Sequence, residues 1–270
     1  MGAERTGGRA CVRWVCAVAM ALAPVAAAAA TEPSYLLAAD GAVMLAVPEG
    51  AQGPSPVVLV LPDALGPDRR SHAYLELLNA QGVATVELLP VGDDGGGTAP
   101  DPAANKPADI LAALAGDPRV DVSRLGVIAF GAGARAALLD PALAGAPAAL
   151  LYPGCSRLPR PEAAAGGAAA ERRPVLVLHG GVDRADAPGA CARWAQAGGP
   201  PVRRHEYVHA TYGWDLSDSP WPDGLTLLPA PGEPGRRVWA RADRATTADA
   251  AARVADFLVG ALDSMVAAAR

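Results

Sequence analysis

Short apolar runs alternate with amphipathic stretches along most of this chain. The runs cover residues 56–62, 83–89, 124–130, 147–152 and 173–179. Nearly every position in them is apolar, as in strands that are buried on both faces. The stretches between them place apolar side chains at helical spacing. Strands that alternate with helices predict an α/β fold, with a doubly wound, mostly parallel sheet and helices on both faces.

The same pattern gives the expected positions of the helices. One is predicted after each of several strands, at 68–82, 108–118, 132–140 and 186–198. A further strand is expected at 202–208, followed by a final helix that Thr247 caps.

Segments rich in glycine, proline and polar residues separate these elements. The stretch 35–50 predicts a β-hairpin or two short edge strands, with a turn at Asp40-Gly41. Residues 90–107 predict a loop, and the spacing of its acidic residues, Asp93 and Asp94, fits no calcium-binding motif. We expect neither a metal nor a cofactor. Residues 215–242, rich in Pro, Gly and Trp, predict a long surface loop.

Residues 1–30 have the pattern of an export signal. A basic start with three arginines precedes an apolar run, and small residues up to Ala30 offer an A-x-A-like cleavage site. The alternative is a membrane anchor, but the run is short and Pro24 interrupts it. We therefore expect an exported protein, periplasmic or secreted, with one domain at 31–270 and no membrane attachment after cleavage.

The net charge and the cysteine content limit the classes of function that we expect. Removing residues 1–30 takes away three Arg and one Glu, which changes the formal net charge from −5 to −7. Without a basic stripe, nucleic-acid binding is not expected. Cys155 and Cys191 remain, and in an oxidising compartment such a pair predicts one disulfide, with two buried thiols as the alternative. The sequence gives no indication of a protein partner.

The turn after residues 124–130 is the first candidate for chemistry, because open α/β sheets carry their sites at the carboxyl ends of strands. Gly131, Gly133 and Ala136 match the dinucleotide-binding pattern G-x-G-x-x-A. That pattern normally follows the first strand, with an acidic residue about 20 positions later. Several strands come earlier here and the acidic residue is missing, so a nicotinamide-dependent oxidoreductase is the weaker interpretation.

The stronger interpretation is a nucleophile elbow, G-x-S-x-G. Ala129 and Gly133 take the two small positions, and Gly131 stands where the serine would be. An elbow residue sits at a strained, positive φ, which glycine adopts without a steric penalty. The sequence therefore keeps the turn and lacks the reactive side chain.

An elbow also fixes the order of the other triad members, an acid and then a base, each just after a later strand. The stretch PVLVLHGGVD ends a strand and reaches Asp183, which is the expected acid. The base is expected in HEYVHATYGWD, after the strand at 202–208.

At this point the chain resembles the dienelactone hydrolase family of α/β hydrolases, in an exported form. The resemblance runs from about Pro54 to Leu262 and includes PVVLVLPDALG, LLYPGC and PVLVLHGGVD. It implies the α/β-hydrolase fold and hydrolysis of esters or lactones through a Cys or Ser, an Asp and a His. The family stretch Y-P-G-A-Y-H-G-F-D, laid on this chain, places Tyr207 on its first Tyr and Tyr212 on the histidine.

Two of the three catalytic groups implied by the resemblance are therefore replaced. Gly131 stands at the nucleophile position and Tyr212 at the base position, whereas Asp183 keeps the acid. A phenol has a pKa near 10 and is a poor general base near neutral pH. The oxyanion hole is expected to survive, with N–H groups from Ala132 and from the DALG loop at Leu65.

Other residues could replace the lost groups. His209 lies three positions before the base position and would act as a displaced base if its loop slipped. Cys155 could act as a nucleophile if it were not bonded to Cys191. We expect an inactive or weak protein that binds a small acyl or lactone-like ligand, with an active ester or lactone hydrolase as the alternative.

Overall fold

The computed structural model of the chain describes residues 33–38, 41–88, 106–159, 173–197, 202–216 and 224–268. Predictions for the export signal at 1–30, for Asp40, and for Asp93 and Asp94 lie outside these ranges. No helix in the described ranges has both the length and the apolar character needed to cross a membrane.

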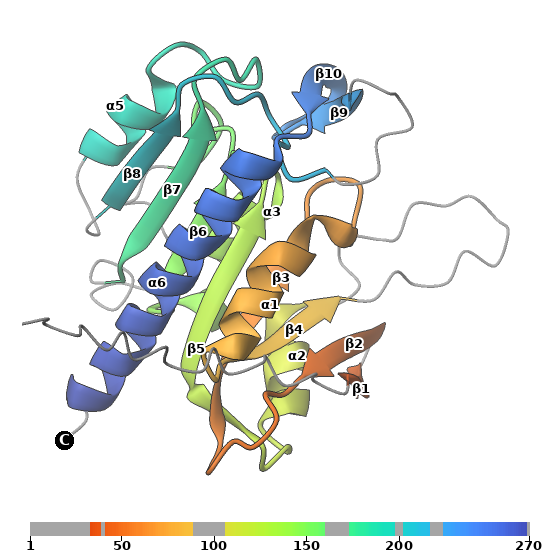
Figure 1. Cartoon of the computed structure of the whole chain (residues 1–270), viewed down its shortest axis with the longest axis vertical. Coiled ribbons are helices and arrows are strands. Elements are labelled where there is room, and N and C mark those ends of the chain that lie inside the picture. The colour runs from red at the N-terminus through yellow and green to blue at the C-terminus, as the bar shows by residue number, and fades with distance from the viewer. Residues whose placement is uncertain are drawn as a thin grey trace, which may run out of the picture.

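A mixed sheet of eight strands forms the centre of the described structure (Figure 1), in the order β1-β2-β4-β3-β5-β6-β7-β8. The strands are β1 (Pro33–Ala38), β2 (Gly41–Ala46), β3 (Ser55–Leu61), β4 (Ala84–Leu88), β5 (Val120–Phe130), β6 (Ala148–Leu151), β7 (Val175–Gly180) and β8 (Val202–Tyr207). Strand β2 is antiparallel to both its neighbours, and the others from β4 to β8 are parallel. The predicted hairpin and parallel strands are thus confirmed.

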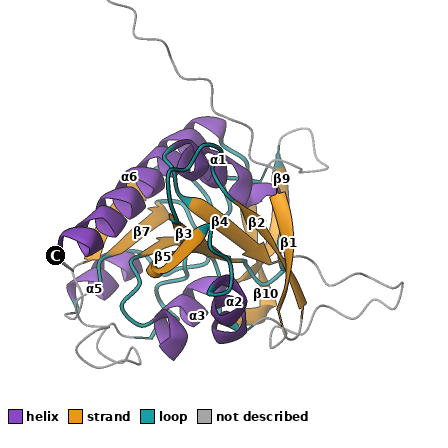
Figure 2. Ribbon diagram, turned by 90° about the horizontal axis from the view of Figure 1, so that it is seen from below, coloured by secondary structure: helices purple, strands orange, loops and turns teal. Residues whose placement is uncertain are grey.

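Helices cover both faces of this sheet, as Figure 2 shows. Helices α1 (His72–Ala80) and α6 (Arg244–Ala268) lie on one face. Helices α2 (Pro107–Leu114), α3 (Gly133–Leu139) and α5 (Ala190–Gln196) lie on the other. Each layer closes its own apolar core, one around α1 and α6 and the other around α2, α3 and α5. The α/β-hydrolase fold class predicted from the sequence is therefore present.

The prediction of a surface loop over 215–242 is wrong. Strands β9 (Leu225–Ala230) and β10 (Glu233–Arg241) pair antiparallel within it and form a separate two-stranded sheet. Its side chains Leu228, Ala230 and Val238 are buried in the core that includes α6. The composition favours a loop because prolines and a glycine lie inside the strands themselves, Pro229 in β9 and Pro234-Gly235 at the start of β10, where the pairing register shifts.

The start of the last helix also differs from the prediction. Helix α6 begins at Arg244, and the Asp243 side chain accepts hydrogen bonds from the N–H groups of Ala245 and Thr246, each at 3.0 Å. Thr247 lies inside the first turn, where its hydroxyl donates to the Asp243 carbonyl. Asp243 is therefore the cap, since a carboxylate at this position satisfies two free N–H groups.

Candidate functional site at the carboxyl edge of the sheet

Gly131 forms the turn between β5 and α3. Its φ is +45°, the left-handed conformation expected at an elbow. A Cβ at Gly133 would lie 2.7 Å from the Leu61 carbonyl oxygen, so the helix approaches β3 closely only because this residue is glycine. The turn follows the fifth strand rather than the first, unlike the dinucleotide-binding pattern.

The space above Gly131 is filled by two other side chains. A Cβ placed there would lie 2.6 Å from the carboxyl carbon of Asp63 and closer still to the Tyr212 hydroxyl oxygen. Because real carbon contacts are never this short, no residue with a side chain fits at position 131 unless Asp63 and Tyr212 move. Tyr212 stands at the predicted base position. Its hydroxyl oxygen thus lies where the side chain of a nucleophile at position 131 would start.

Asp63 occupies the predicted oxyanion hole. Its Oδ1 accepts hydrogen bonds from the N–H of Ala132 at 3.1 Å and from the N–H of Ala64 at 2.7 Å. Ala132 is one of the two predicted donors. Ala64 lies in the same loop as the other predicted donor, Leu65. The two N–H groups that would stabilise an oxyanion are therefore already bound to a carboxylate of the same chain.

The other oxygen of Asp63 is also fully engaged. Its Oδ2 accepts the Tyr212 hydroxyl at 2.6 Å and pairs with Arg70 Nη1 at 3.2 Å. Arg70, held in the short 3-10 turn at Arg69–Ser71, also binds Asp68 at 2.8 Å. Asp63 and Arg70 are both buried, so each charge is compensated inside the protein rather than by water.

A second carboxylate, Asp215, extends this network. Its two oxygens accept the hydroxyls of Tyr152 at 2.7 Å and Tyr74 at 2.8 Å. The Tyr152 hydroxyl also lies 3.5 Å from Arg70 Nη1, which links the two halves. Burial raises the pKa of Asp215 to about 6, although Arg70 and the two hydroxyls oppose this shift. We call these six residues the buried network: Asp63, Arg70, Tyr74, Tyr152, Tyr212 and Asp215.

The surroundings of Tyr212 keep its hydroxyl protonated. Burial, the neighbouring charge of Asp63 and the hydrogen bond to Asp63 raise its pKa well above the ordinary value of 10. A phenol in that state is neither a base nor a nucleophile near neutral pH. The cavity bordering Asp63 and Arg70 holds about 10 Å³, roughly the space for one water. At Gly131 itself, an acyl or lactone-like ligand would meet the side chains of Asp63 and Tyr212.

Asp183, at the acid position after β7, has no base to orient. Its Oδ1 accepts the N–H of Ala185 at 2.7 Å, and its Oδ2 has no hydrogen-bond partner among the described residues. The Tyr212 hydroxyl is directed to Asp63 and not to Asp183. Burial raises the pKa of Asp183 to about 7, so the group is an isolated carboxyl rather than part of a relay.

Two histidines lie near the carboxyl ends of β7 and β8. His209 is exposed in the turn after β8, and it is Tyr212 that reaches Gly131. His179 is buried, its Nε2 lies 2.8 Å from Arg204 Nη1, and burial lowers its pKa. This contact makes His179 a neutral hydrogen-bond acceptor at the edge of the sheet.

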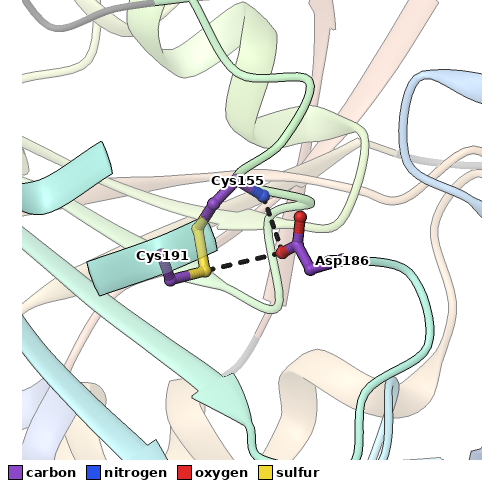
Figure 3. Close-up of side chains that lie close together, drawn as sticks. All are labelled: Cys155, Asp186 and Cys191. Carbon is purple, nitrogen blue, oxygen red and sulfur yellow. Dashed lines mark hydrogen bonds between the residues drawn. A yellow bond between two sulfur atoms is a disulfide. The ribbon is translucent and has the colours of Figure 1, made fainter. Parts of the chain in front are cut away.

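The predicted disulfide is present. Cys155, in the loop after β6, is bonded to Cys191 in the first turn of α5 (Figure 3). Asp186 accepts the N–H groups of Cys155 at 2.8 Å and Ser156 at 2.7 Å. It also contacts Cys191 Sγ at 3.5 Å. A sulfur in a disulfide has no thiolate to offer, so these residues are neither a nucleophile nor a metal site in this form.

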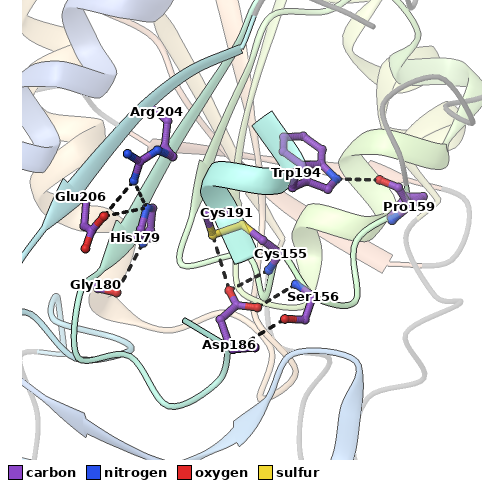
Figure 4. The surroundings of a disulfide bond; sticks show 11 residues. Cys155, Ser156, Pro159, His179, Gly180, Asp186, Cys191, Trp194, Arg204 and Glu206 are labelled. Carbon is purple, nitrogen blue, oxygen red and sulfur yellow. Dashed lines mark hydrogen bonds and ion pairs between the residues drawn. A yellow bond between two sulfur atoms is a disulfide. The ribbon is translucent and has the colours of Figure 1, made fainter. Parts of the chain in front are cut away.

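Figure 4 shows how the disulfide anchors this loop to the rest of the edge. Trp194 of α5 donates from its indole N–H to the Pro159 carbonyl at 2.8 Å, and Asp186 lies between the loop and the helix. Tyr152 starts the same loop with φ +39°, uncommon for a residue with a side chain. The bonds around Cys155 therefore help to hold Tyr152 in the buried network.

Sequence analysis did not identify Asp63, Arg70, Tyr74, Tyr152 and Asp215 as parts of one site. Asp63 belongs to the DALG loop, for which the sequence predicts backbone donors, and the one local signal of its role is a carboxylate just after a buried strand. Its partners Ala132 and Tyr212 are far away in sequence. Only the fold brings these groups together.

Comparison with known proteins agrees with this fold. No protein-family model and no curated protein matches the sequence. Among solved structures, a dienelactone hydrolase-like promiscuous phosphotriesterase from metagenomic libraries is 21% identical, with a TM-score of 0.60 over 86% of this chain and 99% of that one. A dienelactone hydrolase from Anabaena variabilis is 14% identical, with a TM-score of 0.55 over 86% and 98%. The chain thus has the α/β-hydrolase fold of dienelactone hydrolase-like proteins over most of its length.

Proposed function

We propose that this protein is an exported, non-hydrolytic dienelactone hydrolase-like protein whose role is binding. One observation carries the proposal: the Asp63 carboxylate accepts the N–H groups of both Ala132 and Ala64, while the Tyr212 hydroxyl fills the space above Gly131. Every position that acyl transfer requires is taken by a side chain of the protein itself. An acyl or lactone-like ligand at this turn would first have to displace Asp63.

The energetics of the buried network favour this closed arrangement over an open pocket. Removing one member of a buried ion pair costs about 3–5 kcal/mol, because the remaining charge is left without a partner. Asp63 has Arg70 and Tyr212 on one oxygen and two N–H groups on the other. A substrate carbonyl, which is uncharged, would make weaker hydrogen bonds to the same donors.

Ester hydrolysis by the purified protein tests the proposal. With p-nitrophenyl acetate and dihydrocoumarin as substrates, we expect rates equal to those of a non-enzymatic protein at the same concentration. His209→Ala is the control for the alternative of a displaced base. Turnover above background that disappears in His209→Ala would establish an active hydrolase and refute the proposal.

A further inference from the structure

A large cavity lies at the opposite edge of the sheet, at the amino ends of β6, β7 and β8. It holds about 600 Å³, within the range of small-molecule sites. Its walls come from the segments before β6 and β7, from the start of β8 and from α6. Figure 1 shows the C-terminal turns of α6 running past the start of β7.

One wall contains a buried cation, Arg173, that pairs with no carboxylate of the described residues. Arg173 is 2% exposed, and its guanidinium donates to the carbonyls of Ala137 at 2.9 Å and of Leu138 and Leu143 at 3.4 Å. Its Nε has no hydrogen-bond partner, and Arg173 forms no ion pair within the described residues. Buried charges are normally paired, because desolvation costs several kcal/mol per ion.

The rest of the lining combines a second cation with an apolar surface. Arg203 at the start of β8 is exposed and lines the same cavity. Asp256 is the one carboxylate among the lining residues. The Arg203 side chain is exposed, whereas the Arg173 guanidinium is buried and directed to main-chain carbonyls. Phe257 and Met265 of α6 supply apolar walls. Charge and surface together match a molecule with an anionic end and an apolar body.

A glycine on α6 helps to keep the cavity open. Gly260 lies inside α6, where glycine costs about 1 kcal/mol relative to alanine. A Cβ at this position would meet nothing within 4 Å, so packing does not require glycine here. Gly260 lines the cavity, and a longer side chain at this position would project toward that space.

We propose that this cavity binds an organic carboxylate with an apolar body, with the carboxylate at Arg203 in the field of Arg173 and the body against Phe257. A guanidinium recognises carboxylates in a fixed, two-pronged geometry. The buried positive charge of Arg173 adds long-range attraction that only an anion exploits. This proposal does not depend on whether the carboxyl edge is catalytic.

Isothermal titration calorimetry with three matched probes tests the ligand class. Phenylbutyrate, phenylbutanol and phenylbutylamine share one apolar body and differ in charge. We expect the acid to bind at least about tenfold more tightly than the alcohol, a difference of 1.4 kcal/mol, and the amine not to bind. Equal affinity for acid and alcohol, or no binding of the acid, would overturn the proposal.

Variants of the protein test the location. Gly260→Leu fills the cavity and should abolish phenylbutyrate binding, whereas Ala252→Leu, exposed on the same helix and outside the cavity lining, should leave it unchanged. Arg203→Gln should weaken it by about tenfold. Tyr212→Phe, at the opposite edge of the sheet, should leave the affinity for phenylbutyrate unchanged. Loss of binding in Tyr212→Phe but not in Gly260→Leu would place the ligand at the carboxyl edge and refute this site.

Discussion

Two buried arginines show how differently the two edges of the sheet are built. At the carboxyl edge, Arg70 pairs with Asp63 and Asp68 and closes a network that leaves room for about one water. At the amino edge, the partners of Arg173 among the described residues are main-chain carbonyls, and Arg173 borders a cavity of about 600 Å³. A hydrolase fold normally keeps its ligand space at the first edge. Here the space above Gly131 is filled by Asp63 and Tyr212, although a cavity of about 170 Å³ borders Asp183 at the same edge.

The largest expected effect compares these arginines directly. Arg70→Met leaves Asp63 and Asp215 buried without a cation and should lower the free energy of unfolding by about 3–5 kcal/mol. Arg173→Met removes a charge that has no ionic partner and should cost only about 1–2 kcal/mol, for the carbonyls left unbonded. Urea unfolding of both variants measures the difference. An equal or larger cost for Arg173→Met would contradict the contrast between the edges.

The carboxyl edge contains one unpaired group of its own, Asp183, which gives a pH-dependent prediction. Its pKa is about 7 when folded and near 3.8 when unfolded. Protonation therefore stabilises the fold, and this stability is lost as the pH rises from about 4 to above 7. Asp183→Asn keeps the hydrogen bond to Ala185 and should become more stable than the wild type with rising pH, by at most about 4 kcal/mol.

Unfolding of both proteins at pH 5 and pH 8 measures this effect. The difference in stability should be larger at pH 8. A difference that is constant over this range would mean that Asp183 is not an isolated, buried carboxyl. The negative charge of Asp186 raises the pKa of Asp183, and the positive charge of Arg236 lowers it. Arg236→Gln removes that positive charge, so the loss of stability on deprotonation of Asp183 should occur at higher pH.

A pair of glycines gives the smallest expected effects, with opposite signs. Gly131→Ala forces a side chain against Asp63 and Tyr212 at positive φ and should cost about 1–3 kcal/mol. Gly260→Ala meets open space inside a helix and should add about 0.5–1 kcal/mol. Thermal unfolding measures both. If both substitutions stabilise the protein, the space above Gly131 is not filled.

The sequence was sufficient to predict the fold because its evidence is local. Apolar runs identified the strands of the parallel sheet, and the pattern Ala129-x-Gly131-x-Gly133 located the turn at the end of β5. The filling of the site could not be predicted in this way. Asp63 in an oxyanion-hole loop has the same sequence whether its carboxylate faces solvent or bonds to Ala132. That choice depends on Arg70 and Tyr212, which only tertiary packing places beside it.

The missed hairpin illustrates the same limit. Strands β9 and β10 bury Leu228 and Val238 against the core that holds Tyr212 and Trp214. These strands are stabilised by contacts with residues that are distant in the sequence, while their local composition is typical of a loop. Tertiary contacts decided the structure of this segment.

The most direct test of the filled site compares two reactivated variants. Gly131→Ser with Tyr212→His supplies a nucleophile and a base. The serine Cβ forces Asp63 to shift, but its carboxylate stays beside the N–H groups of Ala132 and Ala64 and competes for them. Adding Asp63→Ala frees these donors, and one such donor is worth about a hundredfold or more in turnover. With both variants folded, we predict that the triple variant hydrolyses p-nitrophenyl acetate at least about a hundredfold faster than the double variant. Equal rates would show that Asp63 does not block the hole and would contradict the account.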